Sequence, residues 1–199
     1  MIVALAIGLA LAIQAFVVKP YQIPSPSMEP TLDVGQRVLV NRLTYRFGAD
    51  PSIGDVVVFH PPLGAVPAEQ DPKEPLPMCG ALAADRERGQ ACPMPTSQEA
   101  DTNFIKRVVA LPGDRLKIID GIPIVNGEKV EGDWDINPCR GVGGCDFPKQ
   151  ITIPPDHYFM MGDNRGASDD SRYWGPVPRD WLIGGAFFTY WPPDRIGIL

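Results

Sequence analysis

The sequence predicts a mainly β fold, a coiled sheet or small barrel, preceded by an N-terminal transmembrane helix. The 199 residues include 20 glycines and 23 prolines, yet 44% of all residues are hydrophobic. This composition is too apolar for a disordered chain and too rich in turn formers for a helical bundle, so it favours short strands joined by turns. The first 18 residues differ from the rest because they are apolar apart from Gln14 and carry no charged side chain.

Residues 1–18 are predicted to form a membrane anchor. As a helix they would span about 27 Å, close to the hydrocarbon thickness of about 30 Å. A cleavable signal sequence is the competing interpretation, because Ala10-Leu11-Ala12 offers small residues at a suitable spacing, and a buried core helix is a third. The run lacks a basic beginning and stays apolar beyond those alanines, which favours the anchor.

Strand patterns recur through residues 19–199, the predicted soluble domain. Residues 19–24 should be extended because their prolines exclude a helix. Apolar alternation or continuous apolar runs between turn signals predict further strands over 35–43, 55–59, 104–111, 115–120, 122–130, 150–153, 157–161 and 182–190. Asn126-Gly127 is a strong hairpin signal, and residues 121–150 are expected to form a smaller β subdomain. The proline-rich, charged stretch over 60–103 is predicted to be an insertion or a long surface loop.

Four cysteines suggest an oxidising compartment. Cys79 and Cys92 lie in one irregular stretch and Cys139 and Cys145 in another, which favours two local disulfides and an extracytoplasmic domain. Zinc binding is disfavoured because no CxxC spacing occurs and the chain has two histidines, whereas four unpaired thiols stay open. Lys19, beyond the anchor, would by itself favour the opposite orientation.

Charge and motif content exclude several function classes. The formal net charge of -6 and the isoelectric point near 4.9 disfavour a nucleic-acid partner, because phosphate-binding surfaces are normally basic. Metal, nucleotide and redox-cofactor motifs are missing from the sequence, so no metal or cofactor is predicted and activity should resist chelators.

Candidates for hydrolytic chemistry are few. A hydrolase needs a nucleophile, a base and donors for the developing oxyanion. Prolines hold the serines of residues 24–30 in a stiff run, although such a run can be an ordinary turn. His60 and His157 are poor bases because each adjoins a pair of prolines. Lys106 has apolar neighbours, but a lysine acts as a base only if burial lowers its pKa, and periodicity alone does not distinguish a buried Lys106 from one on an outer face.

Four sequence motifs, which follow one another along the chain in the same order as in a known family, indicate a resemblance to that family. The segments PSPSMEPTL, GDVVVF, FIKRVVALPGD and MGDNR–GA–SDDSRYWG occupy residues 24–32, 54–59, 104–114 and 161–175. Together, behind an apolar segment, they closely resemble the conserved boxes of type I signal peptidases. The resemblance covers nearly all of the chain outside the two irregular stretches. It implies a membrane-bound serine endopeptidase that cleaves signal peptides from exported preproteins.

The resemblance also implies roles for individual residues. Ser27 would be the nucleophile and Lys106 the general base, with the main-chain N–H of Ser27 and the hydroxyl of Ser25 forming the oxyanion hole. Ser168 matches the serine that orients the lysine, and Asp170 and Arg172 match a supporting pair. The residues that match apolar subsites for small side chains, and hence a preference for Ala-x-Ala, are Tyr21, Ile23, Leu32 and Ile105. Residues 162–165 look like framework.

Two departures from the family pattern lie near the motifs. Pro26 stands where many members have glycine, which should stiffen the nucleophile turn. Gly166-Ala167 replaces a common Asp-Asn pair. Neither alters the proposed serine and lysine.

The expected partners are preprotein signal peptides and membrane lipid, with the protein a monomer in the cell membrane and its catalytic domain outside the cytoplasm. A dedicated maturation peptidase with the same dyad is the near alternative. A self-cleaving cytoplasmic regulator would need a helix-turn-helix, which is not visible. A silent membrane-tethered β domain would be credible only if Ser27 or Lys106 were replaced.

Overall fold

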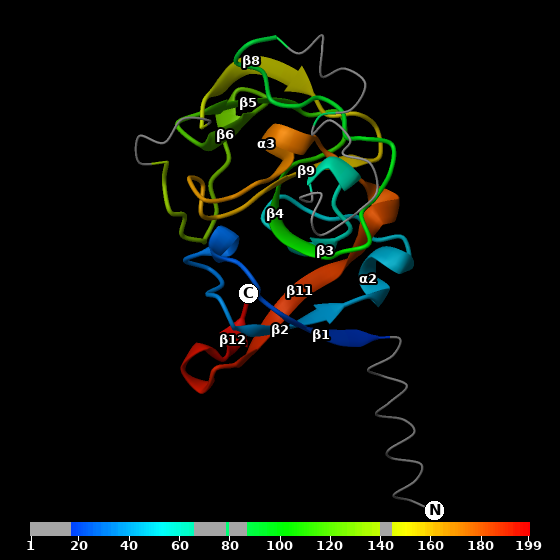
Figure 1. Ribbon diagram of the computed structural model, residues 1–199, viewed down its shortest axis with the longest axis vertical. Helices are drawn as coiled ribbons and strands as arrows, with labels where there is room; N and C mark the ends of the chain where they lie inside the picture. Colours follow the sequence, from blue (N-terminus) through cyan, green and yellow to red (C-terminus); the bar gives the residue numbers. More distant parts are fainter. Residues whose placement is uncertain (1–16, 66–78, 80–86, 140–144) are drawn as a thin grey trace, which may run out of the picture.

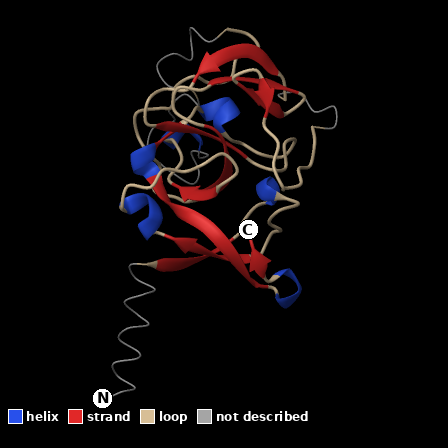
Figure 2. Cartoon of the chain, turned by 180° about the vertical axis from the view of Figure 1, so that it is seen from behind, coloured by secondary structure: helices blue, strands red, loops and turns tan. Residues whose placement is uncertain are grey.

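The computed structural model describes residues 17–65, 79, 87–139 and 145–199, and these residues form two antiparallel sheets (Figure 1). The larger sheet has the order β1-β2-β11-β3-β4-β9-β10, with β12 paired to β11, and the smaller has the order β7-β6-β5-β8. The prediction of a mainly β chain is confirmed. Figure 2 shows strands running through the centre of the molecule and only short helical turns around them.

The strands of the larger sheet are β1 (Val18–Gln22), β2 (Arg37–Asn41), β3 (Val56–Phe59), β4 (Phe104–Ala110), β9 (His157–Met161), β10 (Val177–Pro178), β11 (Leu182–Trp191) and β12 (Gly197–Ile198). Those of the smaller sheet are β5 (Arg115–Ile119), β6 (Ile122–Val125), β7 (Glu128–Lys129) and β8 (Phe147–Thr152). The helices α2 (Leu43–Arg46) and α3 (Ser171–Trp174) have four residues each. The 3-10 turns are η1 (Pro26–Met28), η2 (Leu63–Ala65), η3 (Arg179–Trp181) and η4 (Pro193–Arg195).

Most predicted strands coincide with observed ones, and the differences have local causes. The run over 122–130 divides into β6 and β7 at Asn126-Gly127, whose φ angles of 53° and 96° make the predicted hairpin turn. The run over 35–43 ends early because α2 begins at Leu43, where Asn41 Oδ1 accepts a hydrogen bond from the Leu43 N–H. β8 begins at Phe147, three residues before the predicted start.

The predicted anchor over residues 1–18 lies outside the described residues except for its last two. Val18 already belongs to β1, so the extended segment begins at least one residue earlier than predicted. Of the helices in the described part of the chain, none has the length and apolar character needed to cross a bilayer.

The irregular stretch over 60–103 is described only in part. Its described residues include η2 and a bridge between Pro62 and Glu99, and Cys79 is joined to Cys92. The second irregular stretch is closed by a bond between Cys139 and Cys145. All four cysteines are therefore in disulfides, and neither the zinc alternative nor the free-thiol alternative applies.

β4 occupies the centre of the larger sheet, between β3 and β9. Its residues are buried from Ile105 to Ala110, because apolar clusters cover both of its faces. The long strand β11 crosses from β2 to β3 with irregular register on both sides, which helps to curl the sheet (Figure 1). Gly184 permits the close approach to β2, since a Cβ there would lie 2.2 Å from the Asn41 carbonyl oxygen.

Candidate active site

The two serines of the proline-rich run lie in and beside a short 3-10 turn. Ser25 has an extended backbone and precedes η1, in which Pro26 occupies the first position, where its missing N–H costs no hydrogen bond. Ser27 is 6% exposed, whereas Ser25 is exposed. Met28 has no exposed surface and packs in the apolar cluster beneath the turn. The buried methionine thus fixes the orientation of the serine before it.

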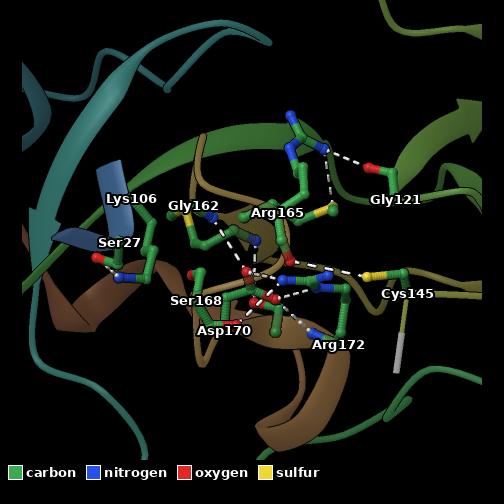
Figure 3. A network of polar contacts seen from close by, with 12 residues as sticks. Ser27, Lys106, Gly121, Cys145, Gly162, Arg165, Ser168, Asp170 and Arg172 are labelled. Atoms are coloured by element: carbon green, nitrogen blue, oxygen red, sulfur yellow. Dashed lines mark hydrogen bonds and ion pairs between the residues drawn. The ribbon is translucent and has the colours of Figure 1, made fainter. Parts of the chain in front are cut away.

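Lys106 reaches this turn from the centre of β4. Its Nζ donates a hydrogen bond to Ser27 Oγ at 2.7 Å, although the two residues are 79 positions apart (Figure 3). Lys106 is 4% exposed, and its Nζ lies 5.5 Å from the centroid of the Phe104 ring. Alternation along the strand puts Phe104, Lys106 and Val108 on one face of the sheet, so Lys106 is the inward-facing lysine that periodicity alone could not identify.

Burial lowers the pKa of Lys106 to about 8, and the negative charges of Asp170 and Asp169 oppose that shift. At pH 7 about a tenth of the molecules would then carry the neutral amine, against less than a thousandth for a solvated lysine. A neutral amine 2.7 Å from a hydroxyl has the geometry to accept its proton.

Ser25 lies next to the pair. Its Oγ is 3.2 Å from Ser27 Oγ, so either hydroxyl can donate to the other. The structure therefore brings Ser25, Ser27 and Lys106 together. The two histidines lie elsewhere: His60 Nδ1 is 2.8 Å from the Thr102 carbonyl oxygen, and His157 Nδ1 is 2.7 Å from that of Pro155.

The loop after β9 holds the main chain of the nucleophile turn. The N–H of Asn164 donates to the Ser27 carbonyl at 3.1 Å, and its side-chain Nδ2 donates to the Pro26 carbonyl at 3.1 Å. Gly162 lies so close that a Cβ there would be 2.3 Å from the Ser27 carbonyl oxygen and 2.3 Å from Ser168 Oγ. The sequence predicts both residues only as framework, because their contacts with Ser27 depend on a pairing that no local pattern reveals.

Asp170 and Arg172 form a buried pair behind Lys106 (Figure 3). Both have no exposed surface, and Asp170 accepts from Arg172 Nε at 2.7 Å, from Arg172 Nη2 at 2.8 Å and from the Gly162 N–H at 3.0 Å. Burial alone would raise the pKa of Asp170, but the charge and hydrogen bonds of Arg172 outweigh it and hold that pKa below its usual value. Asp170 is thus an ionised carboxylate that fixes the main chain of Gly162.

Ser168 is buried beside Gly162, but its Oγ makes no hydrogen bond to any described residue. The two side chains therefore form no hydrogen bond in the described structure, and the role of Ser168 in orienting Lys106 stays a prediction. The Ser168 carbonyl accepts from Arg172 Nη2 at 3.0 Å, which fixes the backbone at this position.

Three of the four residues predicted to bind small side chains line one pocket of about 180 Å³ beside the serine turn. Tyr21 and Ile23 form one wall, and Phe104 and Ile105 of β4 form the opposite wall. Leu32 does not line this pocket: it has no exposed surface and packs beneath it in the same apolar cluster as Ile23. The hydrophobic character of Leu32 therefore reflects the support of the turn.

A second buried ion pair, which no local sequence pattern predicts, lies on the other face of β4. Arg107 donates from Nε to Asp163 Oδ1 at 2.9 Å and from Nη2 to Asp163 Oδ2 at 2.6 Å, and both side chains are almost fully buried. Thr31 donates to the same carboxylate at 2.6 Å, and the Gly54 carbonyl accepts from Arg107 Nη1 at 2.6 Å. The pair thus joins the end of the serine turn, β4 and the loop after β9.

Replacing Arg107 with methionine is expected to destabilise the protein by about 3–5 kcal/mol, because it leaves the Asp163 carboxylate buried without its partner. Urea unfolding followed by circular dichroism measures the change. The matched control is Lys149→Met, which breaks an exposed pair with Glu87 and should cost less than about 1 kcal/mol. Equal losses for the two variants would contradict the importance of the buried pair.

No three His, Cys, Asp or Glu side chains gather as a metal site would require, within the part of the chain that the structure describes.

Comparison with known proteins gives a consistent result. Residues 1–191 match the family model described as "Signal peptidase, peptidase S26". "Probable signal peptidase I-2" of Synechocystis sp. is 34% identical over 194 residues, which cover 98% of this chain and 72% of the relative. "Signal peptidase I" of Leptolyngbya laminosa is 35% identical over 197 residues, covering 99% and 80%. A crystal structure of a signal peptidase I from Enterococcus faecalis V583 has 21% identity and a TM-score of 0.37, covering 68% of this chain and 96% of that one.

Proposed function

Since the chain belongs to the signal peptidase family, peptidase S26, we propose that it is a membrane-anchored serine endopeptidase that removes signal peptides from exported preproteins. Ser27 is the nucleophile and Lys106 the general base. The observation that carries this assignment is the 2.7 Å hydrogen bond between a buried lysine with a pKa of about 8 and a buried serine hydroxyl.

In the first half of the reaction Ser27 Oγ attacks the scissile carbonyl carbon, and its proton passes to Lys106 Nζ. The oxyanion that forms receives hydrogen bonds from the Ser27 N–H and the Ser25 hydroxyl, whose oxygen lies 3.2 Å from the nucleophile. When the C–N bond breaks, the Lys106 ammonium protonates the departing amine, which is the new N-terminus of the mature protein.

In the second half a water molecule attacks the acyl-enzyme ester. Lys106 takes a proton from that water, Ser27 Oγ leaves and is reprotonated, and the signal peptide departs with a new carboxylate. Lys106 thus acts twice as a base and twice as an acid, which requires a pKa near the working pH.

The substrate lies with small side chains in the pocket between residues 21–24 and β4. The pocket of about 180 Å³ has room for alanine-sized side chains, and Tyr21, Ile23 and Ile105 make part of its lining apolar, which supports a preference for Ala-x-Ala before the cut. The apolar segment before β1 anchors the enzyme, and the chain from β1 to residue 199 forms the extracytoplasmic peptidase domain. Because the apolar part of a signal peptide lies in the same bilayer, anchoring raises its local concentration at the site.

Cleavage of a preprotein bearing an Ala-x-Ala site, by the full chain in detergent, tests the assignment. We expect the wild type to make one cut after that site, Ser27→Ala to make none and His157→Ala to match the wild type. The mechanism would be overturned if the His157→Ala variant were inactive while the Ser27→Ala variant still cleaved the preprotein. Cutting of one preprotein from a panel of many would instead indicate a dedicated maturation peptidase.

The rate should rise with pH through the pKa of Lys106. If kcat/KM follows the neutral amine, it is half-maximal at about pH 8 and falls to about 1% of its plateau at pH 6. Initial rates at constant ionic strength between pH 6 and 10 measure the profile. A profile that is flat across pH 6–9 would rule out Lys106 as the titrating base.

A further inference from the structure

The segment from Gly132 to Cys139 belongs to the connection between β7 and β8 of the smaller sheet, and it packs against the larger sheet and the loop after β9. Trp134 lies in it, and two glycines make room for this one ring. A Cβ on Gly54, just before β3, would meet the ring at 3.0 Å, and a Cβ on Gly132 would meet it at 1.6 Å. The ring therefore packs directly on the main chain of Gly132 and of Gly54, which leads into β3 of the larger sheet.

The face of the Trp134 ring covers the guanidinium of Arg107, with Cζ 4.6 Å from the ring centroid. This distance is within the range of a cation–π interaction, for which tryptophan is the strongest partner. The same guanidinium donates hydrogen bonds to Asp163 from Nε and Nη2, and it also donates to Thr31 Oγ1 at 3.2 Å. The ring thus restrains the cation that joins three elements around the serine.

The same segment also touches the loop after β9 through its main chain. The Asn137 N–H donates to the Asp163 carbonyl at 2.9 Å, and the Asn137 carbonyl accepts from the Arg165 N–H at 2.9 Å. Between these two residues lies Asn164, whose N–H donates to the Ser27 carbonyl. Two residues beyond Asn137, the bond from Cys139 to Cys145 closes the segment.

From these contacts we infer that Trp134 is a positioning residue for signal-peptide cleavage: by fixing the Arg107–Asp163 pair, it holds the Ser27 main chain at the distance from Lys106 that reaction requires. Trp134 acts through Arg107 and the loop after β9. This inference rests on the proposed function. It also gives the connection between β7 and β8 a part in catalysis.

The effect should appear in the chemical step. The pocket beside the serine is lined by residues 21–24, Val58 and residues 102–105, and Trp134 is not one of its lining residues, so substrate binding should be preserved. A displacement of about 1 Å at a reacting group can cost about 100-fold in rate, and partial loosening of the pair should cost less.

The test compares Trp134→Leu, Trp134→Phe and Trp191→Leu with the wild type, using steady-state cleavage of a preprotein in detergent. Trp191 is the matched control because it is half exposed at the end of β11. We expect Trp134→Leu to lower kcat about tenfold with KM unchanged within twofold, because leucine has no aromatic face. Trp134→Phe should keep kcat within about threefold of the wild type, and Trp191→Leu should match it.

Three results would overturn the inference while the proposed function stands: a Trp134→Leu enzyme with wild-type kcat, a change in KM alone, or a Trp134→Phe enzyme as slow as Trp134→Leu. A wild type that cleaves no preprotein would overturn both. Circular dichroism checks that each variant is folded. Should Trp134→Leu not fold, Trp134→Met takes its place in the same comparison, since a flexible thioether fills the space without an aromatic face.

Discussion

Replacing Lys106 with methionine is expected to abolish cleavage and at the same time to stabilise the folded protein. Without an amine beside Ser27 no group takes the hydroxyl proton, and kcat should fall by at least about 10⁴-fold, as losses of a base next to a nucleophilic serine generally do. Methionine has nearly the same length and suits a site that is 4% exposed. The same preprotein assay measures the loss.

The gain in stability follows from the lowered pKa. A lysine pKa of about 8 in the folded protein, against 10.5 for the free side chain, corresponds to a cost of about 3 kcal/mol for keeping the charged amine buried. Losing the hydrogen bond to Ser27 offsets about 1 kcal/mol of the gain. Lys106→Met should therefore raise the free energy of unfolding by about 2 kcal/mol at pH 7.

The pH dependence of this gain has a definite sign. Below about pH 8 both the folded and the unfolded chain hold the Lys106 proton, so the full cost of burial is present. Between pH 8 and 10.5 the folded chain has lost that proton while the unfolded chain keeps it, and the wild type becomes more stable relative to the variant. The difference between the two unfolding free energies should accordingly shrink as pH rises from 8 to 10.5.

Lys129→Met is the matched control, because Lys129 is exposed on β7 in the smaller sheet. It should change neither kcat nor stability by a measurable amount. A Lys106→Met protein that is inactive but less stable than the wild type would mean that Lys106 acts chiefly in folding. One that still cleaves would eliminate Lys106 as the base.

Local patterns were sufficient to predict most strands and the hairpin at Asn126-Gly127, because alternation and turn chemistry are encoded within a few residues. The sheet order was not predictable in this way. β11 lies between β2 and β3, although more than 120 residues separate it from β3 along the chain. Such pairing depends on long-range packing that single-sequence periodicity does not contain.

For the site, the resemblance supplied Ser27 and Lys106, and the fold brings them within hydrogen-bonding distance. The residue types alone do not identify Lys106 as the general base. Its pKa depends on its burial, and that burial comes from apolar clusters that β3, β9 and the serine turn form together. Leu32 differs from the other predicted subsite residues, because it is fully buried under the turn and does not line the pocket. The Arg107–Asp163 pair was missed because the two residues are 56 positions apart.

Replacing Gly162 with alanine is expected to lower kcat about 100-fold with little change in KM. The added Cβ would lie 2.3 Å from the Ser27 carbonyl oxygen and 2.6 Å from Ser168 Cβ, far inside the van der Waals contact distance. Because Gly162 is fixed by its hydrogen bond to the buried Asp170, the strain must be relieved largely by movement of the Ser27 turn. A shift of about 1 Å there misaligns Oγ from Lys106 Nζ and costs about 100-fold.

Gly197→Ala is the matched control, since a Cβ at Gly197 would meet no atom within 4 Å and its φ is not in the left-handed region. It should keep wild-type kcat, whereas Gly162→Ala should be slow yet still folded, as judged by circular dichroism and urea unfolding. A Gly162→Ala enzyme within threefold of the wild type would mean that the loop after β9 moves instead of the serine. In that case Asp170 and Arg172 would not be rigid supports of the active site, and their burial would serve the fold alone.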